Sequence, residues 1–144
     1  MPGPEQGSKE LWDLRRRGGR NWGRHMARVL VVEDDDDNRR FLQELLQLDA
    51  HEVHTTRNGR EALVWLRGQR QLPHCIVLDL DMPIMTGQEF FRRLQDEARF
   101  AQIRIIVLSA DPHRHADDLS RTTACLEKPA APDLLIETVA RCAE

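Results

Sequence analysis

The chain has 144 residues and a formal net charge of −3, with 31% charged and 40% hydrophobic residues. This length allows one domain with a substantial core and is too short for two domains of ordinary size. Residues 1–27 hold six Lys/Arg and three acids, which leaves an acidic remainder, and an acidic body argues against nucleic acid as the main partner.

The first 25 residues combine glycine, proline and arginine without sustained hydrophobic periodicity. We expect residues 1–25 to form a flexible or disordered basic arm, and the alternative is an interaction arm that uses Trp12, Trp22 and the arginines. No apolar stretch follows the "RRRGGR" segment, so it does not match an export signal, and no run reaches membrane-spanning length. We therefore expect no membrane association and a folded domain over residues 26–144.

Cysteine usage points to a reducing compartment. Cys75, Cys125 and Cys142 are odd in number and lack the spacing of a disulfide framework or a structural zinc site. This pattern favours a cytoplasmic protein.

From Arg28 onward, short apolar runs alternate with segments of helical period. The predicted strands are "RVLVV" (28–32), "EVHTT" (52–56), "CIVLDL" (75–80), "IRIIVLS" (103–109) and "ACLEK" (124–128). Apolar residues at helical spacing follow four of them: Phe41, Leu42, Leu45 and Leu46; Ala62, Leu63 and Leu66; Phe90, Phe91 and Leu94; Leu135, Ile136 and Val139. Such alternation is typical of βαβ units, and three continuously apolar runs indicate strands covered on both faces. The sequence predicts an α/β fold with a doubly wound five-stranded parallel sheet, whose core includes Trp65 and the phenylalanines of the helices.

Polar side chains stand at the carboxyl ends of the predicted strands, where open parallel sheets place their ligand sites. They are Glu33 and Asp34 after the first strand, Asp79 and Asp81 at the third, Ser109 at the fourth and Lys128 at the fifth. We expect these six groups to converge at one edge of the sheet.

The acidic run "EDDDD" needs a compensating cation, because crowded carboxylates repel one another. Carboxylate, carbonyl and phosphate oxygens are the ligands that Mg²⁺ prefers. Without the metal, repulsion among Glu33, Asp34 and Asp79 should raise at least one pKa. Asp36 and Asp37 instead fall where a helix should begin, as capping and dipole-favourable residues, and Asp35 fits either role.

Lys128 stands out by composition. The chain has 19 arginines and two lysines, and Lys128 is the only lysine after Lys9. This choice suggests a need for a compact point charge, such as one that reaches a phosphoryl oxygen.

Four motifs in order, "VLVVEDD", "CIVLDLDMPIMTG", "IIVLSA" and "LEKP", resemble the receiver domain of two-component response regulators, including the chemotaxis regulators. The resemblance runs from about Arg28 to Ala143. It implies a flavodoxin-like fold with strand order 2-1-3-4-5 and helices on both faces. It also implies a stand-alone, non-enzymatic response regulator that switches contacts with a downstream protein target. Whether the protein forms a homodimer is left open.

The resemblance also implies roles for the predicted site residues. Asp79 would accept a phosphoryl group from a phosphohistidine of a sensor histidine kinase or a histidine phosphotransfer protein. Asp34, Asp79 and the backbone carbonyl of Asp81 would ligate Mg²⁺, with Glu33 acting largely through water. Lys128 would pair with Asp79 and then with the phosphoryl oxygens.

Two further roles follow from the same resemblance. Ser109 would donate its hydroxyl to the phosphoryl group. Lys128 and Pro129 would be joined by a cis peptide bond, which X-Pro sequences tolerate.

The sequence departs from the family pattern at several positions. Cys125 stands three positions before Lys128, where the family usually has Tyr or Phe. This departure calls into question the family's usual coupling between that ring and the Ser/Thr hydroxyl, here that of Ser109. The segment between Ser109 and Lys128 is shortened, and its "DPHRHADDLSRTT" stretch is a poor helix, so the fourth helix should be short or partly melted. Thr86 stands where the family often has Asp, and Ala130 stands where it often has Phe. Asp81 and Asp111 place acids at two further positions of note.

Two rival interpretations remain. The "VLDLDMP" segment also resembles the DxD signature of haloacid-dehalogenase-type phosphatases, although there it usually follows the first strand rather than the third. The other rival is a receiver-like binding module that is never phosphorylated. His113 and His115 lack a third ligand, so we expect them to be solvated.

Overall fold

The computed structural model describes residues 26–80, 85–111 and 124–143. Within these ranges the strands are β1 (Arg28–Val32), β2 (Glu52–Thr56), β3 (Cys75–Asp79), β4 (Arg104–Ser109) and β5 (Ala124–Glu127). The helices are α2 (Asp36–Leu48), α3 (Gly59–Arg67), α4 (Gly87–Asp96) and α5 (Pro132–Cys142), with a short 3-10 helix η1 (Ala98–Phe100). All paired strands are parallel and their order is β2-β1-β3-β4-β5, so the predicted fold class and strand order are confirmed.

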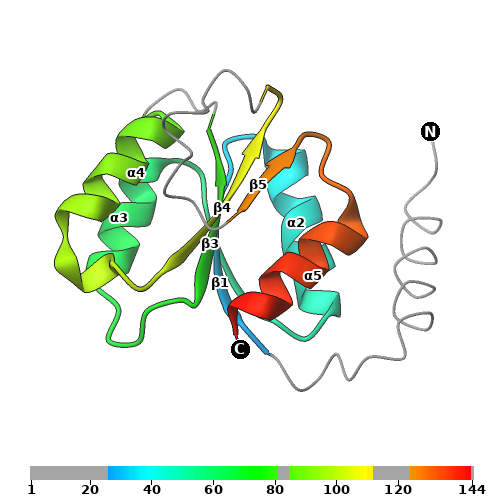
Figure 1. Ribbon diagram of the computed structural model, residues 1–144, viewed down its shortest axis with the longest axis horizontal. Coiled ribbons are helices and arrows are strands. Elements are labelled where there is room, and N and C mark those ends of the chain that lie inside the picture. The colour runs from blue at the N-terminus through cyan, green and yellow to red at the C-terminus, as the bar shows by residue number, and fades with distance from the viewer. Residues whose placement is uncertain (1–25, 81–84, 112–123, 144) are drawn as a thin grey trace.

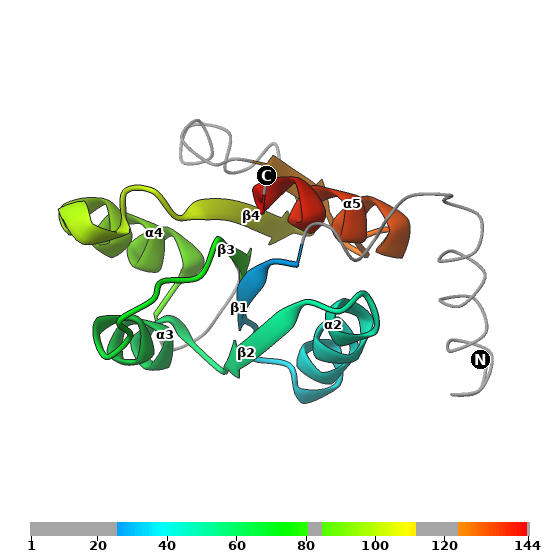
Figure 2. The same ribbon diagram turned by 90° about the horizontal axis from the view of Figure 1, so that it is seen from below.

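The sheet lies between two layers of helices (Figures 1 and 2), with α3 and α4 on one face and α2 and α5 on the other. The central strands β1, β3 and β4 send alternate side chains to the two layers. In β1, for example, Leu30 and Val32 belong to one buried cluster and Val29 and Val31 to the other. Burial on both faces explains why these three strands are continuously apolar in sequence.

Three helices begin at a residue whose side chain caps them. Asp35 accepts a hydrogen bond from the backbone N–H of Asn38, Asn58 accepts one from Glu61, and Thr86 accepts one from Glu89. Each cap satisfies a backbone donor that the helix itself leaves without a partner. The cap assigns Asp35 to the start of α2, and it shows that Thr86 can open α4 in place of the more usual Asp.

The expectation that Phe41 lies in the core is wrong, and that for Trp65 holds only in part. Leu42, Leu45 and Leu46 fill the buried face of α2, so Phe41 falls outside this stripe and is 46% exposed. Trp65 packs against the core with only part of its surface.

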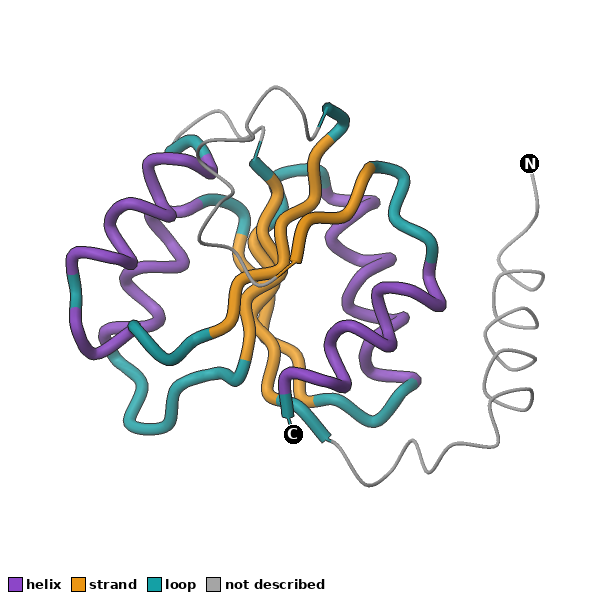
Figure 3. The backbone as a smooth tube through the Cα atoms, in the orientation of Figure 1, coloured by secondary structure: helices purple, strands orange, loops and turns teal. Residues whose placement is uncertain are grey.

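The carboxyl ends of the strands lie at one edge of the sheet (Figure 3), toward which the arrowheads of β4 and β5 point in Figure 1. Register explains this placement, because Val32 pairs with Leu78 and Asp79 with Leu108. The residues that follow these strands therefore start from nearly the same height.

Several predictions fall outside the described residues. They are the basic arm of residues 1–25, Asp81, and the fourth-helix segment of residues 112–123 with His113 and His115. In the part of the chain that the structure describes, no helix has the length and apolar character needed to cross a bilayer.

Candidate functional site at the carboxyl ends of the strands

Asp79 is the last residue of β3, and its side chain is almost completely buried, with 2% of the residue exposed. Lys128, directly after β5, places Nζ 2.7 Å from Asp79 Oδ1 and 4.0 Å from Glu33 Oε2. A charge-assisted contact of this length is among the stronger polar interactions in proteins. The structure thus joins the ends of three strands through one ammonium group.

Glu33 and Asp34 complete an acidic cluster with Asp79. One carboxylate oxygen from each lies within 4.8 Å of the others. Burial first, and then the negative charge of Asp79, raise the pKa of Glu33 from 4.5 to about 7. The expected repulsion among these acids is therefore present, and Glu33 is the residue whose pKa it raises.

The donor set fits a hard divalent cation. Within the described residues the cluster consists of carboxylate oxygens, with one buried acid, Glu33, whose charge is poorly compensated by the protein. A cation would relieve that repulsion, and oxygen donors are those that Mg²⁺ selects. The described part of the predicted ligand set, namely Glu33, Asp34 and Asp79, therefore fits Mg²⁺.

The acidic loop between β1 and α2 is held by hydrogen bonds to β2, within the loop, and from Arg39. Glu33 donates its N–H to Thr56 O at 3.1 Å, and its Oε1 accepts from the N–H of Asp35 at 3.2 Å. Arg39 donates through Nη1 to Glu33 O at 3.2 Å and also pairs with the carboxylate of Asp36. Sequence reasoning missed Arg39, although its i,i+3 spacing from Asp36 is visible in the sequence.

Ser109 ends β4 and is fully buried. Its Oγ accepts a hydrogen bond from the N–H of Asp111 at 3.2 Å, which orients the hydroxyl oxygen. Its carbonyl accepts from the N–H of Lys128 at 2.8 Å, and the Lys128–Pro129 bond is cis, as expected. Backbone contact therefore couples the loops that carry Ser109 and Lys128.

Gly87 supports the segment after Asp79. Its N–H donates to Leu80 O at 3.0 Å, and a Cβ at this position would lie 2.4 Å from Leu80 Cα and 2.9 Å from Asp79 O. Real Cβ atoms do not approach backbone so closely, so only glycine allows α4 to start against the end of β3.

Cys125 takes the place of the expected ring. It lies on β5, pairs with Val107 and packs against the core cluster on the α3–α4 side of the sheet. A thiol fills much less of this space than a phenol or phenyl ring would, so position 125 does not supply the large side chain that is usual there in the family.

A hollow of about 300 Å³ opens beside Lys128, between α2 and the start of α5. Its lining residues are Glu33, Asn38, Phe41, Leu42, Leu108, Lys128, Pro129 and Ala130. The exposed ring of Phe41 lies on its rim, and Ala130 leaves room where the family usually has Phe. The hollow therefore offers an apolar surface next to the charged cluster.

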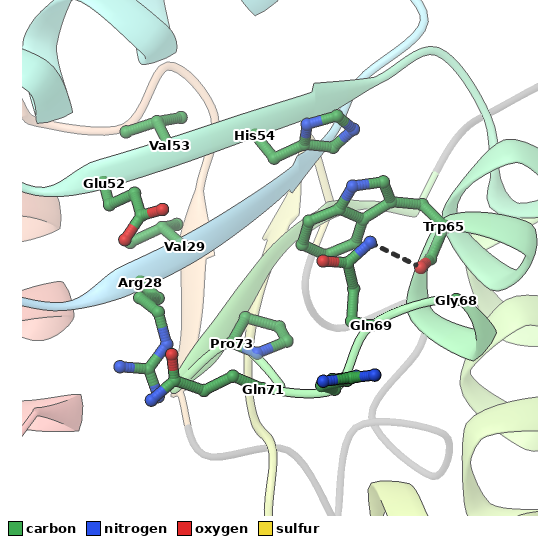
Figure 4. A pocket seen from close by; sticks show the side chains of 11 residues that line it. Arg28, Val29, Glu52, Val53, His54, Trp65, Gly68, Gln69, Gln71 and Pro73 are labelled. Atoms are coloured by element: carbon green, nitrogen blue, oxygen red, sulfur yellow. Dashed lines mark hydrogen bonds between the residues drawn. The ribbon is translucent and has the colours of Figure 1, made fainter.

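A second hollow, of about 600 Å³, lies at the opposite end of the sheet, where Arg28 and Glu52 begin β1 and β2 (Figure 4). In it the rings of His54 and Trp65 stack with centroids 4.3 Å apart. Gln69 Nε2 donates to Trp65 O at 3.2 Å. Burial lowers the pKa of His54, so the neutral ring is favoured in this stack.

A model of the response regulator receiver domain matches residues 29–140. The chain belongs to this family. It is therefore a receiver domain of two-component signalling, and the resemblance found in the motifs is confirmed.

Curated relatives and solved structures agree with this assignment. The polar-differentiation response regulator DivK of Brucella anthropi is 30% identical over 114 residues, which cover 77% of this chain and 91% of DivK. The chemotaxis protein CheY4 of Vibrio cholerae has a TM-score of 0.74 at 31% identity, with 81% of this chain and 98% of that chain covered.

A third comparison concerns the fold alone. The receiver domain of the sensor histidine kinase PA1611 of Pseudomonas aeruginosa PAO1 has a TM-score of 0.73 at 21% identity, with 82% of this chain and 98% of that chain covered. That structure is described with a magnesium ion coordinated in its active-site cleft.

Proposed function

We propose that this receiver domain, over residues 26–144, accepts a phosphoryl group on Asp79 from a phosphohistidine and thereby switches its contacts with a downstream protein. The donor would be a sensor histidine kinase or a histidine phosphotransfer protein. The observation that carries the proposal is the 2.7 Å contact between Lys128 Nζ and the buried Asp79 Oδ1, inside the cluster with Glu33 and Asp34.

The proposed reaction exchanges one bond to phosphorus for another. An oxygen of Asp79 attacks the phosphorus atom, and the bond from phosphorus to the donor imidazole nitrogen breaks. The nitrogen keeps the electron pair and takes up a proton, which leaves an acyl phosphate on Asp79. Transfer of this kind depends on positioning and on neutralising charge at the phosphoryl oxygens. The 2.7 Å contact between Lys128 Nζ and Asp79 Oδ1 supports both roles for Lys128.

Glu33, Asp34 and Asp79, with the backbone carbonyl of Asp81, are the proposed ligands of Mg²⁺. Bound there, the ion would neutralise charge on the oxygens of the transferred group. Magnesium in the cleft of the PA1611 receiver supports this assignment.

Ser109 is the proposed reporter of phosphorylation. A phosphoryl group of charge near −2 offers strong acceptors. The Ser109 hydroxyl, whose oxygen accepts from the N–H of Asp111, would donate its hydrogen to such an acceptor. Movement of Ser109 toward the group would draw the attached Lys128 loop with it, through the bond to the Ser109 carbonyl.

Acetyl phosphate tests the chemistry without a partner. We expect the full chain to gain a single phosphoryl group with Mg²⁺ and none without it, by intact mass. Asp79→Asn should abolish the adduct, whereas Asp96→Asn, at an exposed acid on α4, should leave it unchanged. Continuous phosphate release over many turnovers would indicate a phosphatase. No adduct, either from acetyl phosphate or from phosphohistidine proteins, would indicate a binding module.

The hollow beside Lys128 is the proposed docking surface for the phosphohistidine protein. A donor must bring its imidazole to Asp79, and the exposed ring of Phe41 lies next to this approach. Exposed aromatic rings beside a pocket are typical anchors of protein interfaces.

Docking and chemistry can be separated by the choice of donor. Phe41→Ala should lower the rate of phosphotransfer from a phosphohistidine protein that phosphorylates the wild type by at least about tenfold. It should leave phosphorylation by acetyl phosphate unchanged. Val64→Ala removes a side chain of 67% exposure on the opposite helical layer and should affect neither donor. Equal loss with both donors would contradict the docking role.

A further inference from the structure

Cys75 and Cys142 bring two thiols together at the end of the sheet opposite to Asp79. Cys75 is the first residue of β3 and Cys142 is the last residue of α5. Both side chains lie inside the core cluster that α2 and α5 cover, and each thiol shifts the pKa of the other. Figure 1 shows the C-terminal end of α5 at the edge away from the strand arrowheads. Both cysteines are free thiols in the structure.

Arg104 supplies a positive charge to this pair. It is the first residue of β4, and its Nη1 donates to Arg141 O at 3.0 Å, which fixes the guanidinium beside the last turn of α5. Arg104 is also the strand partner of Cys75, so it lies beside both cysteines, and its charge lowers the pKa of Cys142. Two thiols in one buried cluster with an adjacent arginine are an arrangement suited to thiol chemistry, because a nearby cation favours the reactive thiolate.

The two thiols are not equivalent. Interaction with Cys75, followed by the charge of Arg104, lowers the pKa of Cys142 to about 7, and the same interaction together with burial raises the pKa of Cys75. The Cys142 thiol donates to Thr138 O, one turn earlier in α5, at 3.4 Å. Cys142 is also the more accessible of the two, at 6% exposure against 0% for Cys75. Cys142 is therefore the nucleophile, and Cys75 is the protonated neighbour.

We propose that Cys75 and Cys142 form a reversible intramolecular disulfide when the chain meets hydrogen peroxide. The Cys142 sulfur attacks one peroxide oxygen, the O–O bond breaks, and hydroxide leaves, which gives a sulfenic acid on Cys142. The sulfur of Cys75 then attacks the Cys142 sulfur. The S–O bond breaks, and the hydroxyl leaves as water with the thiol proton of Cys75. In total, two thiols and one peroxide give one disulfide and two water molecules.

Cys125 provides a control within the same chain. It packs against the core cluster on the other face of the sheet, which separates it from the pair. Burial raises the pKa of its thiol, so it is less often ionised than Cys142.

The test uses the reduced full chain, treated with one equivalent of hydrogen peroxide and then alkylated in denaturant. We expect a mass lower by two hydrogens, a fall in alkylated thiols from three to one, and a peptide map that links Cys75 to Cys142. Dithiothreitol should restore all three thiols. Cys125→Ser should still form the link, and Cys142→Ser should lose it.

Each other result would overturn the proposal. These results are three thiols still open to alkylation, a disulfide that includes Cys125, a bond between two chains, or oxidation of Cys142 past the sulfenic acid without loss of the Cys75 thiol. The peptide map of the wild-type chain decides among them even if a serine variant folds poorly, and circular dichroism shows whether it does.

Discussion

His51 Nε2 lies 2.9 Å from Asp49 Oδ2, and both side chains are buried at the turn between α2 and β2. His51 Nδ1 accepts a hydrogen bond from the N–H of Ala27 at 2.9 Å, so a ring proton lies on Nε2, toward Asp49. The approach of Nε2 to the carboxylate is close but not aligned as a full hydrogen bond. His51 therefore links the residue before β1, through a hydrogen bond, to the carboxylate that follows α2.

Removing the carboxylate should destabilise the fold, because it takes away the negative group that faces the buried Nε2 of His51. We expect Asp49→Ala to lower the free energy of unfolding by about 2 kcal/mol in urea denaturation. Glu44→Ala changes an exposed acid on the same helix and should shift it by less than about 0.5 kcal/mol. Equal losses in the two variants would show that the buried pair is not what stabilises this turn.

Glu33 should make stability depend on magnesium. In metal-free, mildly alkaline buffer, Glu33→Gln removes a buried charge that Asp79 repels, and we expect it to raise the free energy of unfolding by about 1 kcal/mol.

Magnesium should reverse this ranking, because an ion that binds only the folded state stabilises it. The wild type should gain more from Mg²⁺ than Glu33→Gln, and thermal melts with and without chelator measure the difference. Glu52→Gln, at an exposed acid on β2, should change neither the stability in metal-free buffer nor the stabilisation by Mg²⁺. A Glu33→Gln variant that gains as much as the wild type would remove Glu33 from the ligand set.

Arg39 should set the affinity of the acidic loop for the metal, because it positions the carbonyl of Glu33 from the first turns of α2. We expect Arg39→Ala to weaken Mg²⁺ binding by about tenfold, as is typical for residues that orient metal ligands. Isothermal titration calorimetry measures the dissociation constant for Mg²⁺. Arg40→Ala, at the exposed neighbour, should bind as the wild type does.

Gly87 should be intolerant of any side chain. Gly87→Ala places Cβ against the backbone of Leu80, so we expect a loss of about 2 kcal/mol or more in unfolding free energy and slower phosphorylation of Asp79. Gly68→Ala is the matched control, because the nearest atom to its Cβ would be 3.6 Å away. If the two glycine variants proved equally stable, the close approach of α4 to β3 would be refuted.

His54 should make stability fall in mild acid. Its folded pKa is lowered from 6.5 by burial, so the unfolded chain takes up a proton first as the pH drops, and stability is lost below about 6.5. Trp65→Ala opens this environment and should move the pKa back toward 6.5, which proton NMR of the imidazole measures. His74, whose pKa is lowered by its own burial and by Arg28, should keep its value.

The sequence predicted the sheet and most of the site because both depend on local patterns. Continuous apolar runs marked β1, β3 and β4, and polar residues at strand ends marked Glu33, Asp34, Asp79, Ser109 and Lys128. Once the strands are parallel, register alone brings these ends together.

Other features depend on contacts between distant segments, which no local pattern encodes. Arg39 reaches back to a carbonyl in the preceding loop, and Cys75 meets Cys142 only after the whole chain has folded. The exposure of Phe41 was missed for a related reason. Helical spacing shows which residues share a face, but the width of the buried stripe is set by the neighbouring layers.

The hydrogen bond from the Lys128 N–H to the Ser109 carbonyl closes a loop that contains all the residues between those two. Inserting or deleting residues in a loop that is closed in this way changes the free energy of unfolding little, since the entropy of loop closure changes slowly with length. The shorter segment between Ser109 and Lys128 in this chain is therefore compatible with the close placement of Lys128 and Asp79.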